Sequence, residues 1–400
     1  EVEIRDAKNQ NARTFLLNGQ PIKMRGANRH ESSPMYGHYT PDELIELDVK
    51  QLKQANCNHV RNAHYPQPDY FYYLCNKYGI YVMDEANIES HGLYYGAASI
   101  SHVKSWEPAH VQRAMNMVER NKNHPAVIFW SHGNECGSGR NFRAADDAVH
   151  QRDPSRPTHY EGDWSNSDVD SNMYPSVNLV WWHAKDKNAK RPYYICEYAH
   201  NMMNAMGNLK DYQDAIDSSD VVIGGTIWDW VDQGLYKLNK DGVKIIGYGG
   251  DWGDRPNSGQ FVMNGCILSD RELEPGYWEI KHVYQPVSVT LDEGAQSVTV
   301  WNKQFFRGLD VYNVTASVLV NGERQTTMKV DLDAVPPRGK KTLMIPEAAR
   351  RALVFLSAAS GTPCPSSSPS TSSAVRSRPP SRRVTWRRSD RVRKHHEHHK

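Results

Sequence analysis

Cysteine is scarce in this sequence, and the cysteines that occur follow no pattern. The 400 residues include six, with no CxxC pair among them: Cys57, Cys75, Cys136, Cys196, Cys266 and Cys364. Their scatter argues against a disulfide-stapled domain and against a thiolate zinc site. Long apolar runs are missing too, so no stretch is a candidate for a helix that spans a bilayer.

Most of the chain has no large excess of positive or negative charge. The formal net charge is only +2. Residues 376–400 alone carry a net charge of +8, which leaves about −6 on the preceding 375 residues. A mildly acidic body gives no sign of a nucleic-acid surface. A basic tail that binds nucleic acid is a weaker alternative, and it would show salt-sensitive binding that is lost when the tail is deleted.

The length and the aromatic content favour a large catalytic domain. Four hundred residues accommodate a barrel of about 250 residues and further structure. The 21 tyrosines and 11 tryptophans exceed what a core requires. Their flat faces suit the apolar faces of sugars, although each single aromatic can equally serve packing.

The start of the chain resembles the end of an earlier domain. Residues 1–20 are expected to finish a preceding β-sandwich domain, with a short hairpin at 14–20. The chain begins at Glu1 without a methionine, so the start looks internal. We expect a cytoplasmic location.

Short apolar runs alternate with helical patterns from residue 21 to residue 285. This alternation predicts repeated βα units and an α/β fold, a (β/α)8 TIM barrel. An amphipathic helix is expected at 42–55. The eight expected strands lie at 22–26, 58–61, 80–84, 127–131, 158–160, 169–172, 194–196 and 222–228.

The pattern changes near residue 286. Residues 288–291, 297–301, 311–320 and 326–332 alternate polar and apolar side chains, with an Asn-Gly pair at 321–322. They predict a truncated antiparallel β-sandwich, immunoglobulin-like, over 286–346. Residues 347–400 are rich in Ser, Pro, Arg and His, which predicts a low-complexity basic tail that is disordered or non-native.

Two glutamates each follow an apolar run. Glu135 comes after AVIFW at 126–130, and Glu197 comes directly after YYIC at 193–196. Carboxylates at the carboxyl ends of buried parallel strands are where a barrel of this kind holds its chemistry. A pair of carboxyl groups is also what cleavage of a glycosidic bond requires.

The segments around these glutamates resemble glycoside hydrolase family 2, and specifically its β-galactosidases. The resemblance covers residues 15–345 and rests on an ordered set of motifs. They are GANRHE at 26–31, VRNAHYP at 60–66, DEANIESHG at 84–92, GNE at 133–135, CEYAH at 196–200 and WDWVDQ at 228–233. One such motif alone would be a weak signal, whereas the ordered set is specific.

The resemblance implies roles for the two carboxyl groups. It makes Glu135 the acid/base and Glu197 the nucleophile of a retaining mechanism. Asn134 would contact the sugar 2-hydroxyl, a contact that strengthens in the transition state. It also implies sugar contacts for six residues, each of which could instead have a purely structural role: His30, His64, Tyr174, His200, Trp228 and Asn264.

Metal sites are implied in the same way. Glu89 and His91, together with Glu135, would hold Mg²⁺, with Mn²⁺ as a substitute because imidazole is a less usual ligand for Mg²⁺. By spacing alone, Glu-x-His is typical of a solvated loop. Phe261 and Asn264 match positions that hold Na⁺ in the family, but a further ligand comes from a domain outside this sequence.

Two smaller expectations concern the surroundings of the site. Asp84 and Glu85 are expected to hold Arg61 and neighbouring groups, because buried acids need a cationic partner. Trp230 is expected to pack. Met203 departs from the family, which commonly has glycine there, and is expected to crowd the acceptor side.

The expected function is therefore that of a retaining exo-β-galactosidase. It would remove terminal β-D-galactose from β-galactosides such as lactose through a covalent galactosyl-enzyme, and the full-length protein would form a homo-oligomer. A β-glucuronidase or β-mannosidase is the alternative within the family. A catalytically silent fragment that binds sugar or assembles with other subunits is the alternative outside enzymes.

Overall fold

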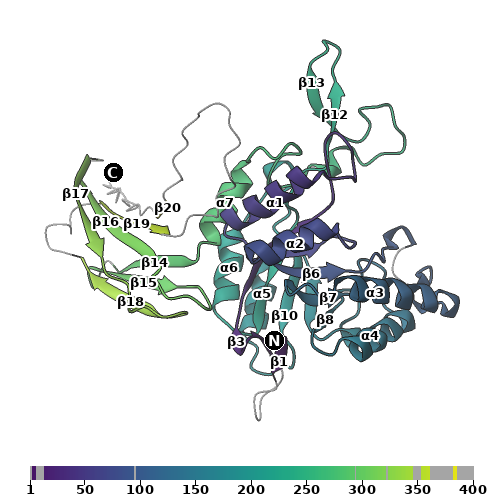
Figure 1. Ribbon diagram of the computed structural model, residues 1–400, viewed down its shortest axis with the longest axis horizontal. Helices are drawn as coiled ribbons and strands as arrows, with labels where there is room; N and C mark the ends of the chain where they lie inside the picture. The colour runs from purple at the N-terminus through teal and green to yellow at the C-terminus, as the bar shows by residue number, and fades with distance from the viewer. Residues whose placement is uncertain are drawn as a thin grey trace, which may run out of the picture. The chain divides into compact units, whose positions relative to one another are not determined.

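The computed structural model describes residues 2–5, 13–93, 96–292, 294–320, 323–345, 353–360 and 382–384. The chain divides into two compact units, Glu1–Tyr284 and Gln285–Lys400 (Figure 1). This division falls one residue before the expected end of the barrel domain.

Eight parallel strands form the centre of the first unit. In chain order they are β4 (Met24–Arg29), β5 (His59–Asn62), β6 (Tyr81–Glu85), β7 (Val127–Ser131), β8 (Thr158–His159), β9 (Asp170–Met173), β10 (Tyr193–Tyr198) and β11 (Val222–Ile227). Their hydrogen-bonded order is β8-β7-β6-β5-β4-β11-β10-β9. At the seam the Asp168 amide donates to the Thr158 carbonyl at 3.2 Å. The predicted TIM barrel is confirmed, and each expected strand overlaps an observed one.

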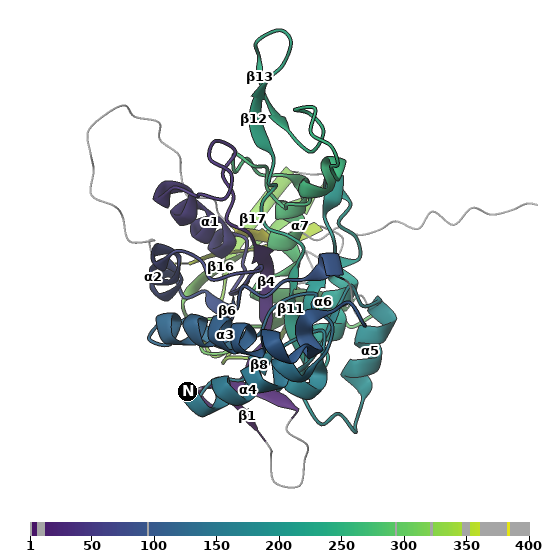
Figure 2. The ribbon, with the colours of Figure 1, turned by 90° about the vertical axis from the view of Figure 1, so that its right-hand side faces the viewer.

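Helices surround the strands, as Figures 1 and 2 show. In the described part of the first unit they are α1 (Asp42–Gln54), α2 (Asp69–Tyr78), α3 (Glu107–Asn121), α4 (Arg140–Arg152), α5 (Val177–Lys185), α6 (Leu209–Asp217) and α7 (Pro275–Val283). In α1 the buried residues Ile45, Val49 and Leu52 recur at helical spacing, so one face packs on the barrel. The helix expected at 42–55 is confirmed.

Short 3-10 turns complete the connections. They are η1 (His91–Leu93), η2 (Ile100–His102), η3 (Lys104–Trp106), η4 (Trp164–Asn166), η5 (Met202–Asn204) and η6 (Gly259–Val262). The segment between β8 and β9, all of it described, contains η4 and no α-helix. A barrel connection can therefore lose its helix and leave the strand order intact.

Close packing of the strands requires glycine at the β4–β11 contact. Gly224 has φ +115°, and a Cβ there would lie 2.0 Å from the Met24 carbonyl oxygen. No other residue fits between these backbones. The large apolar core lies between strands and helices, and Trp130, Tyr193 and Ile195 are among its fully buried members.

Two smaller sheets belong to the first unit. β1 (Val2–Arg5), β2 (Thr14–Leu17) and β3 (Gln20–Pro21) form one antiparallel sheet, and β2–β3 is the expected hairpin. Phe15 of β2 stacks on Phe129 of β7 with ring centroids 4.8 Å apart. The sequence did not predict the second hairpin, β12 (Leu235–Leu238) with β13 (Lys244–Gly247), which projects from the barrel (Figure 2).

The second unit contains two antiparallel sheets. One consists of β14 (Val287–Asp292), β15 (Ser297–Asn302) and β18 (Lys340–Met344), and the other contains β16 (Tyr312–Val320) and β17 (Glu323–Val330). Val300 of β15 and Val314 of β16 share one buried cluster, so the sheets pack face to face as in a β-sandwich. The expected Asn-Gly turn at 321–322 lies outside the described residues.

Regular structure occurs within the expected basic tail. β19 (Leu353–Ser360) pairs with β16, and β20 (Arg382–Val384) pairs with β19. The expectation of no order across 347–400 therefore does not hold for these two strands, which find partners on the edge of a sheet. The remaining tail residues lie outside the described part of the chain.

The described residues include no helix that is both long and apolar enough to cross a membrane. Within the same part of the chain, the cysteines at 57, 75, 136, 196 and 266 are free and buried. Cys364 lies outside it.

Candidate active site

Glu135 and Glu197 lie at the same end of the barrel. Glu135 follows β7, the fourth barrel strand, and Glu197 is the second-last residue of β10, the seventh. Parallel strands end on one side of a barrel, and that side is where such folds hold their sites. The expected placement of both glutamates is confirmed.

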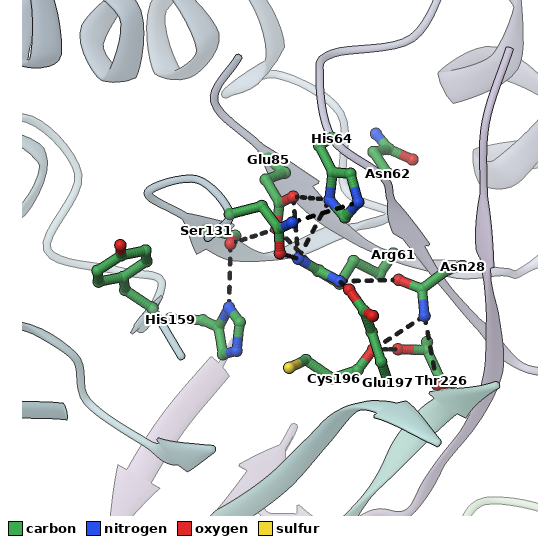
Figure 3. Close-up of polar contacts among 12 residues, drawn as sticks. Asn28, Arg61, Asn62, His64, Glu85, Ser131, His159, Cys196, Glu197 and Thr226 are labelled. Atoms are coloured by element: carbon green, nitrogen blue, oxygen red, sulfur yellow. Dashed lines mark hydrogen bonds and ion pairs between the residues drawn. The ribbon is translucent and has the colours of Figure 1, made fainter. Parts of the chain in front are cut away.

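A buried arginine connects the surroundings of the two glutamates (Figure 3). Arg61, at 0% exposure, donates from Nη1 to Glu197 Oε1 at 2.9 Å and from Nη2 to Asn134 Oδ1 at 2.9 Å. Nε and Nη2 also donate to the two oxygens of Glu85 at 2.7 and 3.0 Å. The planar guanidinium thus fixes three side chains from three strand ends at once.

Glu197 has a donor at each carboxyl oxygen. Arg61 binds Oε1, and the Tyr174 hydroxyl donates to Oε2 at 2.8 Å. Burial, and then the nearby Glu197 charge, raise the pKa of Tyr174, so the phenol keeps its proton for this bond. Tyr174 therefore lies beside the expected nucleophile, and the orientation of the Glu197 carboxyl group is fixed.

Glu135 lies apart from the residues around Arg61, in a group of side chains that are potential metal ligands. One ligand atom each from Glu89, His91 and Glu135 lies within 4.8 Å of the others, and His91 Nδ1 is 2.9 Å from Glu135 Oε2. Burial, together with the charges of Glu135 and Glu85, raises the pKa of Glu89 to about 7, against the bond from Asn134. The structure therefore brings the three expected ligands together.

Asn134 connects the two groups. Its Oδ1 accepts from Arg61, while its Nδ2 donates to Glu89 Oε2 at 2.7 Å and approaches His64 Nε2 at 3.4 Å. An amide oxygen accepts two hydrogen bonds and an amide nitrogen donates two. The free capacity of this side chain is therefore one lone pair on Oδ1, which can accept from a hydroxyl group.

The backbone around Glu135 adopts uncommon conformations. Glu135 has φ +42° and Gly133 has φ +144°, and a Cβ on Gly133 would lie 2.5 Å from the Ile88 carbonyl oxygen. The Asn134 amide donates to that carbonyl at 2.9 Å. A left-handed glutamate is held only where surrounding contacts enforce it, and such residues concentrate at functional sites.

Three expected sugar-contact residues form an aromatic cluster. The rings of His64 and Trp228 stack with centroids 5.3 Å apart, and His30 meets each edge-on at 5.4 Å. Burial, and then Arg61, lower the pKa of His64 to about 3. The ring is neutral, so its Nδ1–H donates to Glu85 Oε1 at 2.7 Å.

His200 lies between two other expected residues. Its ring is 5.8 Å from that of Tyr174 and 6.0 Å from that of Phe261. The Asn264 Nδ2 donates to the Phe261 carbonyl at 3.0 Å, while its buried Oδ1 has no hydrogen-bond partner among the described residues. As placed, the amide nitrogen and not the oxygen faces that carbonyl, so a Na⁺ between the two oxygens would require the amide to turn.

The expectation for Asp84 holds only in part, because this residue binds Asn62, a neighbour of Arg61, and not Arg61 itself. Glu85 holds Arg61, but Asp84 accepts from Tyr72, Asn62 and Asn121 at 2.6–2.8 Å. Neighbouring residues of a strand point to opposite faces, so only one of the two acids can reach Arg61. Trp230 is buried next to Tyr277, with ring centroids 6.2 Å apart, as expected for a packing residue.

Some residues around the site were missed from the sequence. Asn28 accepts from Arg61 at 3.0 Å and donates to the Cys196 carbonyl at 2.9 Å. Ser131 donates to Glu85 at 2.7 Å. Glu161, two residues after β8, is within electrostatic reach of Glu135 and Glu197. Asn28 lies in the 26–31 motif and Ser131 closes the apolar run of β7, so position at a strand end was the available signal.

Comparison with known proteins adds a family match. The family model "Glycosyl hydrolases family 2, TIM barrel domain" matches residues 7–289. The chain is 41% identical over 351 residues to a protein of Vibrio cholerae named beta-galactosidase, covering 83% of this chain and 34% of that protein. A beta-galactosidase of Photobacterium profundum gives 41% over 352 residues, with the same coverage. The chain thus spans about a third of the length of these relatives.

Solved structures share the fold at lower identity. A beta-glucuronidase of Faecalibacterium prausnitzii aligns with a TM-score of 0.53 and 21% identity, covering 71% of this chain and 51% of that one. A GH2 beta-galacturonidase of Eisenbergiella tayi, bound to glycerol, gives 0.54 and 22%, covering 71% and 53%. At these identities the likeness concerns the fold alone.

Proposed function

This chain belongs to glycosyl hydrolase family 2, and from that premise we propose that it is the catalytic part of a retaining exo-β-galactosidase. The enzyme would remove terminal, non-reducing β-D-galactose from β-galactosides such as lactose. The relatives at 41% identity carry the name beta-galactosidase, which supports galactose as the sugar. The site geometry supports the chemistry.

The observation that carries the proposal is the bridge made by Arg61. One guanidinium holds Glu197 at 2.9 Å and, at the same distance, the residue next to Glu135. The buried Arg61 therefore positions Glu197 directly and Glu135 through the adjacent Asn134. Retaining glycoside hydrolysis needs such a fixed pair, because one carboxyl group must attack while the other delivers a proton.

In the proposed reaction each carboxyl group has one task per step. Glu135 gives its proton to the glycosidic oxygen as the bond from that oxygen to the anomeric carbon breaks, and a Glu197 oxygen forms a new bond to that carbon. The leaving alcohol departs. Glu135 then takes a proton from water, whose oxygen attacks the anomeric carbon and releases Glu197 with galactose.

The remaining residues would bind the sugar. The free lone pair of Asn134 would accept from the 2-hydroxyl group, and Trp228 would carry the ring on its face. His30, His64 and His200, with Tyr174 and Asn264, would contact the other hydroxyl groups. Neutral imidazoles suit this task, since the ring nitrogen without a proton can accept from a hydroxyl group.

Charge around the site favours a neutral sugar over a uronic acid. Arg61 is engaged by Glu85, Glu197 and Asn134, and Glu161 adds a further carboxyl group. A uronate carboxylate would meet repulsion from these acids. Galactose, which carries no charge, would not.

A divalent cation fits the group of Glu89, His91 and Glu135, whose ligand atoms converge within 4.8 Å. We propose Mg²⁺ there, with Mn²⁺ as a substitute that accepts imidazole more readily. When bound, the ion would supply positive charge that fixes the Glu135 carboxyl group. We propose Na⁺ near Phe261 as well: the buried Asn264 Oδ1 has no partner within the described part of the chain, and the amide would turn to bring this oxygen beside the Phe261 carbonyl.

Hydrolysis of nitrophenyl glycosides tests the function. We expect release of nitrophenol from the β-galactoside with Mg²⁺ present, a lower rate after EDTA, and none from the β-glucuronide or β-mannoside. A preference for either of these sugars would assign another family 2 activity. A folded chain that is inactive on all three would indicate a silent sugar-binding or assembly fragment.

Two further measurements test the roles. A 2-fluoro galactoside that traps the covalent intermediate should label Glu197 in the wild type, and label nothing in Glu197→Gln. Glu135→Gln should lose far more rate on alkyl galactosides than on dinitrophenyl galactoside, whose leaving group needs no proton. Equal losses on both substrates would contradict an acid role for Glu135.

A further inference from the structure

Met203 has a backbone conformation that suits glycine. Its φ of +51° and ψ of +39° lie in the left-handed region, where a Cβ is crowded. Its amide donates to the Met263 carbonyl at 3.0 Å, so the conformation is held by the neighbouring segment. The side chain is 64% exposed and therefore gains little from packing to offset the strain.

Met203 belongs to a rim of exposed apolar side chains around His200. Tyr174 is 46% and Phe261 57% exposed, and both rings lie within 6.0 Å of the His200 ring. Met203 follows His200 by three residues and is bonded to the segment that carries Phe261 and Asn264. The rim is also adjacent to the candidate active site, since the Tyr174 hydroxyl donates a hydrogen bond to Glu197.

The residues at this end of the barrel are of two kinds, buried and exposed. The buried groups around Arg61 fit the sugar ring that is cleaved. Because that ring is terminal, the rest of the substrate extends from the anomeric carbon toward solvent. Exposed apolar side chains on the rim are then the ones that meet the leaving group, and strained backbone is typical of such positions.

We propose that Met203 is a specificity-determining residue that contacts the leaving group of the substrate and favours apolar or aromatic ones. This inference rests on the proposed galactosidase function. An unbranched thioether adapts to different shapes and makes favourable contacts with aromatic rings. Glycine would relieve the backbone but would remove the contact.

Ligand affinity tests the contact without requiring turnover. Phenyl and methyl β-thiogalactoside share the sugar and differ in the apolar group, so the ratio of their dissociation constants isolates the leaving-group side. Met203→Gly removes the side chain, and Met203→Gln keeps its length and makes its end polar. Asn208→Gly is the control, because Asn208 is also left-handed, with φ +56°, and is exposed in the same connection.

Both Met203 variants should bind the phenyl ligand about fourfold more weakly, the change that one methylene group of buried surface produces, with methyl-ligand affinity unchanged. Met203→Gly should unfold at the wild-type temperature or above it, whereas a structural residue would lower that temperature. Asn208→Gly should change neither affinity.

The outcomes separate the inference from the function on which it rests. If the wild type binds both ligands and their ratio is the same in every variant, the role of Met203 is refuted and the galactosidase proposal stands. If the wild type binds neither ligand, the galactosidase proposal is refuted and the inference falls with it.

Discussion

Asp48 is predicted to contribute strongly to the stability of the barrel through its buried ion pairs. The side chain lies on α1 at 0% exposure. Arg29 Nε and Nη2 donate to it at 3.1 and 2.9 Å, and Arg271 Nε and Nη2 donate at 2.9 and 3.1 Å. One carboxylate thus joins the residue before His30 to the loop that precedes α7.

Asp48→Asn keeps the shape and removes the charge. Both carboxylate oxygens accept from guanidinium groups, so the new amide NH₂ meets a donor in either orientation. Arg29 retains Glu31 as a partner, but among the described residues Arg271 retains only the carbonyls of Ser32 and Ser269. Removing one partner of a buried ion pair costs about 3–5 kcal/mol.

Thermal unfolding followed by circular dichroism measures this loss. For a unit of this size we expect the midpoint to fall by roughly 5–8 °C. Glu43→Gln is the matched control, because Glu43 is exposed in the first turn of the same helix, where a carboxylate contributes about 0.3–1 kcal/mol. If both variants shift the midpoint equally, the reasoning about Asp48 is refuted.

Three further variants test other parts of the barrel. Arg61→Lys should lower kcat roughly 100-fold, because an ammonium has three donors and cannot make the five hydrogen bonds by which the guanidinium holds its partners; a rate near the wild type would contradict the bridge. Gly133→Ala should lower the unfolding midpoint and abolish turnover, since its Cβ would lie 2.5 Å from the Ile88 carbonyl. Burial raises the pKa of Asp232 to about 7, so its stabilising contribution, complete below about pH 4, is lost as pH rises through 7. Urea titrations of Asp232→Asn should therefore show a gain over the wild type that grows from pH 4 to 8, up to about 4 kcal/mol.

The barrel could be predicted because its strands are buried on both faces. Val127–Ser131 is buried at all five positions, and such a run stands out in the sequence as continuous apolar residues. The β12–β13 hairpin could not be found in this way. Its four-residue strands are half exposed, so neither an apolar run nor a clear alternation marks them.

The proposed catalytic pair was likewise easier to find in the sequence than the groups that hold it. Glu135 and Glu197 follow strong apolar runs, so their position at strand ends is evident from the sequence. Alternation along β6 shows that only one of Asp84 and Glu85 can face the barrel interior, but not which one. Asp48 did carry a signal, since it lies beside Val49 and between Ile45 and Leu52 on the buried stripe of α1, where a lone acid requires cations.

Strain at this site is confined to the connections that follow the strands. Four residues near the site have positive φ: Glu135, Tyr174, Ala199 and Met203. Glu135 follows β7, Tyr174 follows β9, and the other two follow β10. The parallel ladders of β10 and of β6 with β7 also contain register shifts, one of them between Ile195 and Glu197. Because the buried strands fix both ends of each connection, the barrel can hold one or two unfavourable residues there. The connection that carries Glu135 is buried and packed against its neighbours, whereas the Met203 side chain is exposed and has few packing contacts. We therefore expect leaving-group preference to change by substitution at the rim while the chemistry at Arg61 stays the same.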